Sequence, residues 1–183
     1  MIKKIDRYNY VQGTRYMDNG SRNYDVAGQR LPSVTTILGR TKDDTFLKDW
    51  KKKVGEKEAE RIKNASAVRG TSMHKYLENY VLGRGYEDLT ELGKETKRMA
   101  QKVIEVGLAP VSGFFGSEVT LYYPGLYAGS TDLVGIHNDK ETVIDFKQAN
   151  RPKREEWIGD YKLQAAAYAM AHDQVHGSNI EQC

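Results

Sequence analysis

Three short apolar segments, separated by turn signals, constrain the fold of this chain more than any other feature. Each is predicted to be a strand, and they cover residues 117–123, 127–136 and 142–148. Pro124 and Gly125 form the first turn, and residues 137–140 form the second. Connections this short join strands that run in opposite directions, so the three segments predict an antiparallel meander.

Helical periodicity precedes and follows these strands. The predicted helices cover residues 34–38, 44–54, 55–66, 71–82, 92–106 and 154–176. Ser33 is the expected N-cap of the first helix. The second helix is amphipathic, because apolar side chains recur at every fourth residue, at Phe46, Trp50 and Val54. The last and longest helix is expected to pack through an apolar side made of Trp157, Tyr161, Ala165 and Tyr168.

The first thirty residues have a different character. Residues 5–30 are rich in Tyr, Gly, Asn and Asp, and they predict a short irregular hairpin that turns at Asp18-Asn19-Gly20.

A length of 183 residues, 39% of them hydrophobic and 29% charged, fits one folded domain. Its expected parts are a hairpin over 1–30, a helical part over 31–107, and a sheet core with the long helix over 116–183. This order predicts an α/β fold with helices packed on a mixed sheet.

Composition sets limits on the compartment and the partners. Lys plus Arg number 28 and Asp plus Glu number 25, so the net charge of +3 leans only weakly toward polyanions such as nucleic acids. One cysteine, Cys183, cannot form an intramolecular disulfide or a cysteine-based zinc or iron–sulfur site. No apolar run approaches membrane-spanning length, and the first residues lack a signal-peptide core. We therefore expect a soluble cytoplasmic protein with no membrane partner.

Two acidic residues and a lysine carry the strongest chemical signal. Asp145 and Lys147 are two apart on the third predicted strand, so they point to the same face. A hairpin that turns at residues 137–140 places Asp132 directly across from Asp145. Two carboxylates at that distance repel each other unless a cation lies between them, and hard oxygen ligands favour Mg²⁺ or Mn²⁺. A lysine beside the ion can hold the attacking water and neutralise phosphate charge. The alternative is a structural Asp–Lys ion pair.

A second group lies on a predicted helix. His74 and Glu78 are spaced i, i+4, so they share one helix face. Arg69-Gly70-Thr71 is expected to open this helix, and its N-terminal amides with Arg69 would form a phosphate cradle. The alternative is a surface His–Glu pair with no ligand.

Three further polar residues have both a functional and a structural interpretation. Glu118 lies on the first predicted strand and is either part of the site or an outward-facing strand residue. Gln164 and Tyr168 are i, i+4 on the long helix and either brace the site or belong to a helix packed through its alanines.

These motifs in this order resemble the RecB-type branch of the PD-(D/E)XK nucleases, and within it the phage exonucleases and the mitochondrial genome maintenance exonucleases. The resemblance spans roughly residues 31 to 171. It rests on Arg-Gly-Thr-Ser-Met-His74, Glu118, Gly129-Ser-Thr-Asp132, Ile144-Asp145-Phe-Lys147 and Gln164-Ala-Ala-Ala-Tyr168. The family fold is a restriction-endonuclease-like central mixed sheet flanked by helices.

The resemblance implies roles for individual residues. The implied metal ligands are His74, Asp132, Asp145 and the carbonyl of Phe146, with Mg²⁺ or Mn²⁺ as the ion. Lys147 would be the catalytic lysine, Glu118 a supporting group or a ligand of a second ion, and Gln164 and Tyr168 braces or DNA contacts. The implied DNA-binding residues are Ser33, Thr35, Thr36, Arg69, Thr71 and Arg151, the last in a basic cluster with Lys153 and Arg154.

The function expected on these grounds is a metal-dependent DNA exonuclease that acts on single strands or duplex ends in a bacterium or a phage-infected cell. The alternatives are a structure-selective endonuclease or nickase, a non-catalytic DNA-binding module, and a hydrolase of smaller phosphodiesters. Strand polarity, strand preference, the number of metal ions and the oligomeric state are left open.

The last residues suggest a family domain that stops early. Gly177 should end the long helix, and residues 180–183 begin a strand that halts after four residues. An unpaired sheet edge of this kind recruits other chains, so strand exchange or dimerisation through residues 178–183 is expected.

Overall fold

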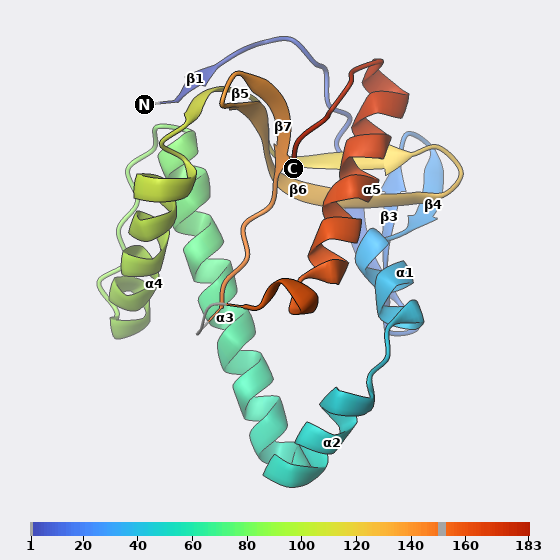
Figure 1. The fold of residues 1–183 in the computed structure, drawn as a ribbon, viewed down its shortest axis with the longest axis vertical. Coiled ribbons are helices and arrows are strands. Elements are labelled where there is room, and N and C mark those ends of the chain that lie inside the picture. Colours follow the sequence, from blue (N-terminus) through green and yellow to red (C-terminus); the bar gives the residue numbers. More distant parts are fainter. Residues whose placement is uncertain (1, 150–152) are drawn as a thin grey trace.

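The central feature of the fold is a mixed sheet of four strands. The computed structural model describes residues 2–149 and 153–183 (Figure 1). In the sheet order β1-β5-β6-β7, the strands are β1 (Lys3–Lys4), β5 (Val111–Tyr123), β6 (Tyr127–His137) and β7 (Lys140–Ile144). Strands β5 to β7 form the predicted antiparallel meander, and β1 runs parallel to β5. The predicted mixed sheet is therefore confirmed, although β7 ends at Ile144 rather than at Gln148.

The register between β6 and β7 is the one that the sequence predicts. Val134 pairs with Val143, and the last pair of the ladder is Leu133 with Ile144. Asp132 and Asp145 come next along the two strands, one residue beyond the last pair. The two acids therefore lie where the hydrogen-bonded ladder gives way to irregular backbone.

A small second sheet precedes the helices. It consists of β2 (Thr14–Asp18), β3 (Ser21–Val26) and β4 (Gln29–Pro32), all antiparallel. The predicted hairpin is confirmed at its first turn, where Asn19 and Gly20 have φ values of 47° and 76°. A second turn of the same kind at Ala27 and Gly28 adds a strand that the sequence analysis did not predict. Ala27 gave no signal, because alanine seldom adopts a positive φ.

Helices cover both faces of the central sheet (Figure 1). They are α1 (Val34–Thr41), α2 (Thr45–Val54), α3 (Glu56–Val81), α4 (Glu91–Lys102) and α5 (Gly159–His176). A π-helical turn (Val103–Gly107) continues α4, and a 3₁₀ turn (Glu155–Trp157) precedes α5. None of the helices in the described part of the chain is long and apolar enough to cross a membrane.

The two faces of the sheet belong to two separate clusters of buried side chains. Val134 and Val143 pack with α5 and α1, whereas Leu133 packs with α3 and α4. Because neighbouring residues on a strand point to opposite faces, one strand supplies both clusters. The sheet is therefore held between α3 on one side and α5 on the other (Figure 1).

The largest departure from the predicted fold is α3. The sequence pattern predicts two helices, over 55–66 and 71–82, but one continuous helix spans Glu56–Val81. Arg69-Gly70-Thr71 lies in its interior, where backbone N–H groups are used in i→i−4 hydrogen bonds. The predicted phosphate cradle of N-terminal amides is therefore wrong. A glycine within a helix costs about 1 kcal/mol, and the packing of α3 against α4 and β5 offsets that cost.

Two predicted apolar faces are only partly buried. In α2, Phe46 is 84% exposed and none of the helix residues is fully buried, so its apolar side is uncovered in this structure. The long helix begins at Gly159 rather than at Arg154, and Trp157 is 59% exposed instead of packed. The buried residues of α5 are Gln164, Tyr168, Ala169, Ala171 and His172.

A hydrogen-bonded chain around His172 fastens the N-terminal segment and the last residues to α5. The Tyr10 hydroxyl is 3.0 Å from His172 Nε2, and His172 Nδ1 is 2.6 Å from the Ser178 hydroxyl. Ser178 in turn donates to Asp173 at 2.6 Å. These partners fit a neutral His172 that donates from Nδ1 and accepts at Nε2. Burial lowers the pKa of His172 to about 4, with the neighbouring His176 acting in the same direction.

The last residues lie along the free edge of β7. Gln182 forms a single parallel bridge with Thr142, and its carbonyl accepts a hydrogen bond of 3.3 Å from the Val143 amide. Ile180 is buried in the cluster under α5. The predicted contact of residues 180–183 with the sheet edge is present as one bridge rather than as a strand. Dimerisation through this edge stays a prediction.

Replacing Gly70 by alanine should stabilise the protein, because Gly70 lies inside α3 and a Cβ there would meet nothing within 4 Å. We expect Gly70→Ala to raise the free energy of unfolding in urea by about 0.5–1 kcal/mol. Gly129→Ala is the contrasting control, because its Cβ would lie 2.4 Å from the Tyr168 ring. That overlap should cost about 1–3 kcal/mol. Destabilisation by Gly70→Ala would show that α3 is not continuous.

Acid should weaken the fold through His172. Its folded pKa of about 4 lies below the unfolded value of 6.5, so the unfolded chain binds the proton more tightly. The contribution of His172 to the free energy of unfolding is fully present above pH 6.5 and is lost as the pH falls toward 4. The loss should reach roughly 3 kcal/mol. Urea unfolding of wild type and His172→Gln across this range isolates the effect, because the variant lacks the titrating ring. Parallel pH profiles for the two proteins would contradict the assignment.

Candidate metal centre

Three elements bring three ligand-type side chains to one point beside the sheet. His74 comes from α3, Glu118 from β5 and Asp132 from β6. One nitrogen or oxygen of each side chain lies within 4.8 Å of those of the other two. Two of these residues, Asp132 and His74, were predicted as ligands, and Glu118 was predicted as a supporting group or as a ligand of a second ion. The structure brings all three together.

The carboxylate of Asp132 is held from two sides. His74 Nδ1 lies 2.7 Å from Asp132 Oδ1, and the backbone N–H of Phe146 donates to Asp132 Oδ2. The residue is only 9% exposed. Because the β6–β7 ladder ends at Leu133, the amide of Phe146 is free of strand pairing and available to this side chain. Both oxygens of Asp132 therefore have fixed directions.

Glu118 reaches the cluster through an unusual backbone conformation. Its φ is 52°, which is the left-handed region that non-glycine residues seldom adopt. It lies between the paired residues Ser117 and Val119 of β5 and has no partner of its own in the ladder. The strain of such a conformation is typical of functional sites. Its carboxylate lies near that of Asp132, although the residue is exposed, and a role for Glu118 in the site stays a prediction.

Burial and the nearby Asp132 change the acidity of Glu118. Part of Glu118 reaches solvent, yet burial of its carboxyl, followed by the charge of Asp132, raises its pKa to about 7. His74 acts in the opposite direction, and Glu78 adds to the rise. The pKa of His74 is itself raised, first by its hydrogen bond with Asp132. Burial and the neighbouring acids thus disfavour the charged form of Glu118.

Asp145 and Lys147 lie beside this cluster, on the irregular segment that follows β7. Lys147 Nζ forms an ion pair with Asp145 Oδ2, and it also lies 5.5 Å from the centroid of the Tyr161 ring. Burial raises the pKa of Asp145, Lys147 opposes that rise, and the charge of Asp132 adds to it. The two acids are thus close enough to interact, as predicted. Asp145 is not one of the three residues whose ligand atoms converge within 4.8 Å.

Gln164 and Tyr168 lie behind β6 rather than in the cluster. Gln164 Nε2 donates to the Tyr168 hydroxyl at 2.9 Å, and both side chains are buried. A Cβ at Gly129 would lie 2.4 Å from the Tyr168 ring, so only glycine lets α5 approach the strand this closely. Gly129 is three residues before Asp132 on β6. The pair therefore supports the strand that carries Asp132, which fits the predicted role of a brace.

The hydroxyls near the start of α1 serve mainly as a helix cap. Ser33 is buried, and its Oγ accepts from the Thr36 amide at 3.0 Å, as predicted for an N-cap. Thr36 Oγ1 donates to the carbonyl of Arg22 at 2.9 Å. Thr35 is exposed, although its hydroxyl lies 2.9 Å from that of Ser33. Of the three predicted DNA contacts here, Thr35 is the one most accessible to a strand.

The other residues that were predicted to contact DNA or the metal ion differ in their surroundings. Arg69 has a side chain only 17% exposed and lies 3.8 Å from Glu95 of α4, so it faces the neighbouring helix. Thr71 is exposed, one turn before His74 on α3. Arg151 lies outside the described residues. For Phe146, the group seen in contact with the site is its N–H, bonded to Asp132, and the ligand role of its carbonyl stays a prediction.

Sequence reasoning missed two contributions. Glu78 was paired with His74 by its spacing, but its influence on Glu118 was not predicted, because that depends on how α3 lies against β5. Tyr161 was assigned to an apolar helix side, whereas its ring faces the Lys147 ammonium. Nothing in the local pattern signals either contact, because each joins residues far apart in the chain.

The donor set fits a divalent cation. Carboxylate oxygens and an imidazole nitrogen bind such ions at about 2.0–2.6 Å, so ligand atoms around one ion lie roughly 3–5 Å apart. The donor atoms of His74, Glu118 and Asp132 fall in that range. A cation there would also offset the repulsion by Asp132, which adds to the effect of burial on the pKa of Glu118.

The chain is similar in sequence to two vertebrate proteins that are named as exonucleases. It is 31% identical to mitochondrial genome maintenance exonuclease 1 of Mus musculus over 187 residues, covering 93% of this chain and 54% of that protein. It is 29% identical over 173 residues to the protein of the same name from Xenopus tropicalis, covering 87% and 48% respectively. The chain thus spans about half the length of the curated relatives it matches. No model of a known protein family matches it.

Removal of one carboxylate charge should disrupt ion binding. We expect Asp132→Asn to weaken Mn²⁺ binding to the metal-stripped protein at least about tenfold, because the amide keeps an acceptor for Phe146 but loses the charge. His74→Ala should weaken binding too, with partial rescue at high Mn²⁺. Asp139→Asn is the matched control, on an exposed turn with a φ of 62° that asparagine tolerates. Calorimetric titration measures all four proteins. Equal affinities for wild type and Asp132→Asn would rule out this site.

Proposed function

We propose that this chain is a Mg²⁺- or Mn²⁺-dependent deoxyribonuclease of the PD-(D/E)XK type that removes nucleotides from DNA ends. The observation that carries the proposal is the convergence of His74, Glu118 and Asp132 beside the Asp145–Lys147 pair. The similarity to proteins named exonucleases points in the same direction. A structural ion pair alone would not require three further ionisable side chains at the same point.

Each residue has a role that follows from its position. Asp132, His74 and Asp145 would hold the ion, with Glu118 as a further ligand or as the base that orients a water. When bound, the ion would lower the pKa of a water ligand and polarise the phosphoryl oxygens. Lys147 is exposed to solvent and paired with Asp145, so its ammonium would face the scissile phosphate and neutralise charge as the bond breaks.

Exonuclease action is favoured over endonuclease action only by the names of the relatives, so it is the part of the proposal that most needs a direct test. A structure-selective endonuclease or nickase would use the same residues. A bacterial or phage setting stays a prediction, since the two relatives are vertebrate proteins. The exposed Thr35 and Thr71 and the exposed Lys153 and Arg154 are proposed to contact the DNA backbone.

The decisive experiment compares linear and closed circular DNA. End-labelled linear DNA and covalently closed circles are incubated with the metal-stripped protein plus Mg²⁺, Mn²⁺ or EDTA. We expect the linear substrate alone to be degraded, with either ion and not with EDTA. Cleavage of the circles would identify an endonuclease instead. Full activity in excess EDTA would end the metal-dependent proposal altogether.

Lys147→Ala should fold and bind the ion but cleave at least about 10²-fold more slowly, a typical loss for one electrostatic group in a reaction site. The comparison is kcat at saturating DNA beside a thermal melt. Lys140→Ala is the matched control, because Lys140 is exposed at the opposite end of β7. If Lys147 only pairs structurally with Asp145, the variant will instead melt earlier and keep its rate per folded molecule.

A further inference from the structure

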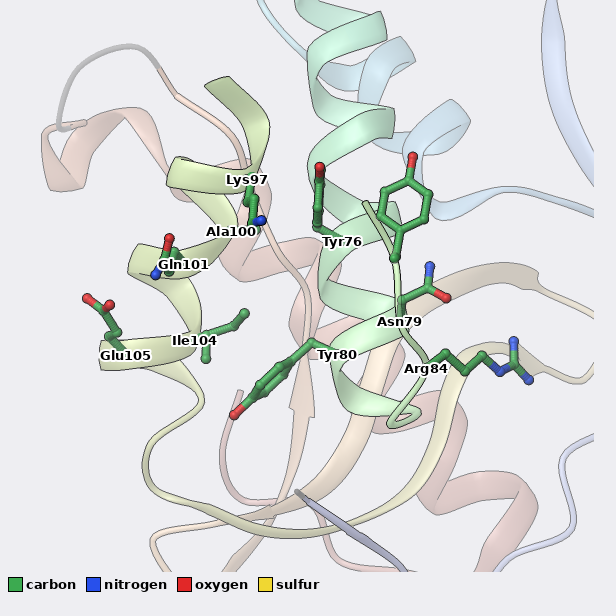
Figure 2. Close-up of a pocket in the computed structure, with 10 residues that line it drawn as sticks. Tyr76, Asn79, Tyr80, Arg84, Lys97, Ala100, Gln101, Ile104 and Glu105 are labelled. Carbon is green, nitrogen blue, oxygen red and sulfur yellow. The ribbon is translucent and has the colours of Figure 1, made fainter. Parts of the chain in front are cut away.

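A cavity lies away from the candidate metal centre. It has a volume of about 400 Å³ and lies between the C-terminal half of α3, the loop after it, and α4 with its π-helical turn (Figure 2). Tyr76, Asn79 and Tyr80 line it from α3, whereas His74 of the same helix faces Asp132. At 100° per residue these side chains lie on another side of the helix from His74. The two sites therefore share a helix but no residue.

Contacts within the protein hold the aromatic side chains of the cavity in place. The rings of Tyr76 and Tyr86 meet edge to face, with centroids 4.7 Å apart. The Tyr76 hydroxyl accepts from the Asp88 amide at 2.9 Å, which fixes the loop that carries Tyr86. Tyr80 is 39% exposed and extends toward Ile104, and its ring is not stacked on another aromatic side chain in the described residues (Figure 2). A flat apolar ligand would find a ready surface there.

Charged and amide groups surround this aromatic surface. Arg84 and Glu105 lie at opposite ends of the cavity (Figure 2). Within the described part of the chain, neither side chain forms an ion pair or hydrogen bond. Gln101 lies on the same wall as Glu105 and offers both a donor and an acceptor. Lys97 also lines the cavity and is paired with Glu87 at 3.2 Å. One end is therefore suited to an anion and the other to hydrogen-bond donors.

The wall that contains Ile104 and Glu105 is a π-helical turn, Val103–Gly107. Such turns are rare, and they occur mostly at functional sites, where the extra residue changes the direction of side chains. Here the turn supplies both an apolar and an acidic group to the cavity. The unusual backbone thus coincides with the pocket rather than with the metal centre.

We propose that this cavity binds a single nucleotide. The base would lie against Tyr80 and Ile104, the phosphate would meet Arg84, and an exocyclic amine of the base would donate to Glu105. The nucleotide could be a free monophosphate or one unit of a DNA strand, because both present the same ring and the same anion. This inference goes beyond the nuclease function and requires no metal ion.

The chemistry favours a nucleotide over simpler aromatic or anionic ligands. A cavity of this volume falls within the range of about 300–1000 Å³ found for small-molecule sites. Stacking of a base on an aromatic side chain contributes a substantial part of nucleotide affinity in other proteins. An isolated anion would use Arg84 alone and leave the tyrosines unused. An uncharged aromatic would leave Arg84 without a counter-charge, and only a ligand with both parts uses both ends.

The test is a binding titration in EDTA, so that no metal ion can hold a phosphate at the other site. Deoxyadenosine monophosphate, thymidine monophosphate, adenosine and a short deoxyadenosine oligonucleotide are each added to the full chain, and binding is followed by calorimetry. Tyr80→Ala and Arg84→Ala remove the proposed base and phosphate contacts. Leu89→Ala and Arg98→Ala are matched controls, because both are exposed, close in sequence and absent from the cavity wall.

We expect Tyr80→Ala and Arg84→Ala to weaken deoxyadenosine monophosphate binding at least about tenfold, and the controls to change it by less than about threefold. Adenosine should bind more weakly than the monophosphate and be insensitive to Arg84→Ala. Thymidine monophosphate, which lacks an exocyclic amine, should bind more weakly too. Tight binding of the oligonucleotide alone would identify the DNA strand as the source of the nucleotide.

The proposal is overturned if neither the monophosphate nor the oligonucleotide binds saturably, or if the controls lose as much affinity as Tyr80→Ala and Arg84→Ala. Circular dichroism confirms that each variant is folded. A chain that binds the monophosphate through Tyr80 but cleaves no DNA would refute the nuclease function and leave this proposal standing. A chain that cleaves DNA but does not bind the monophosphate would support the nuclease function and refute the nucleotide site. The two failures are therefore distinguishable.

Discussion

The Asp132 carboxylate joins three parts of the chain that are distant in sequence. Its own strand is β6, its Oδ1 is bonded to His74 of α3, and its Oδ2 is bonded to the backbone of Phe146 after β7. A buried carboxylate is costly unless hydrogen bonds satisfy both oxygens. The packing of α3 against the sheet and the path of the chain after Ile144 are both needed to satisfy it. The position of Lys147 depends on the path of the chain after Ile144, whereas Glu118 lies beside Asp132 because β5 pairs with β6 there.

The sheet and its acidic edge could be predicted from the sequence because they depend on local signals. The turn at residues 137–140 sets the register, and a register error of one residue would exchange the two faces of β6. Leu133 and Val134 must point to different apolar clusters, which excludes such an error. Once the register is set, Asp132 and Asp145 have to be neighbours at the end of the ladder. Ser33 is predictable for the same reason, since capping is local.

The features that could not be predicted depend on tertiary context. Periodicity identifies an apolar face on α2, but it carries no information on whether another element covers Phe46, which stays exposed. Gly70 resembles a helix boundary, yet packing of α3 on α4 and β5 keeps the helix intact through it. Glu118 carries no signal for its positive φ, because glutamate rarely adopts one without an external constraint. The register shifts between β5 and β6 lie before Gly116, so no bulge at Glu118 marks this conformation in advance.

The continuity of α3 gives the molecule a property that two separate helices would not have. One rigid helix carries His74 toward Asp132 and, two residues on, Tyr76 toward the cavity beside α4. A break at Gly70 would loosen both positions, because the turn that precedes His74 would lose its hydrogen bonds. The acids around Asp132 repel one another when charged, which tends to separate them. The packing of Met73 and Leu77, both almost fully buried on α3, opposes that tendency and keeps the ligand group assembled.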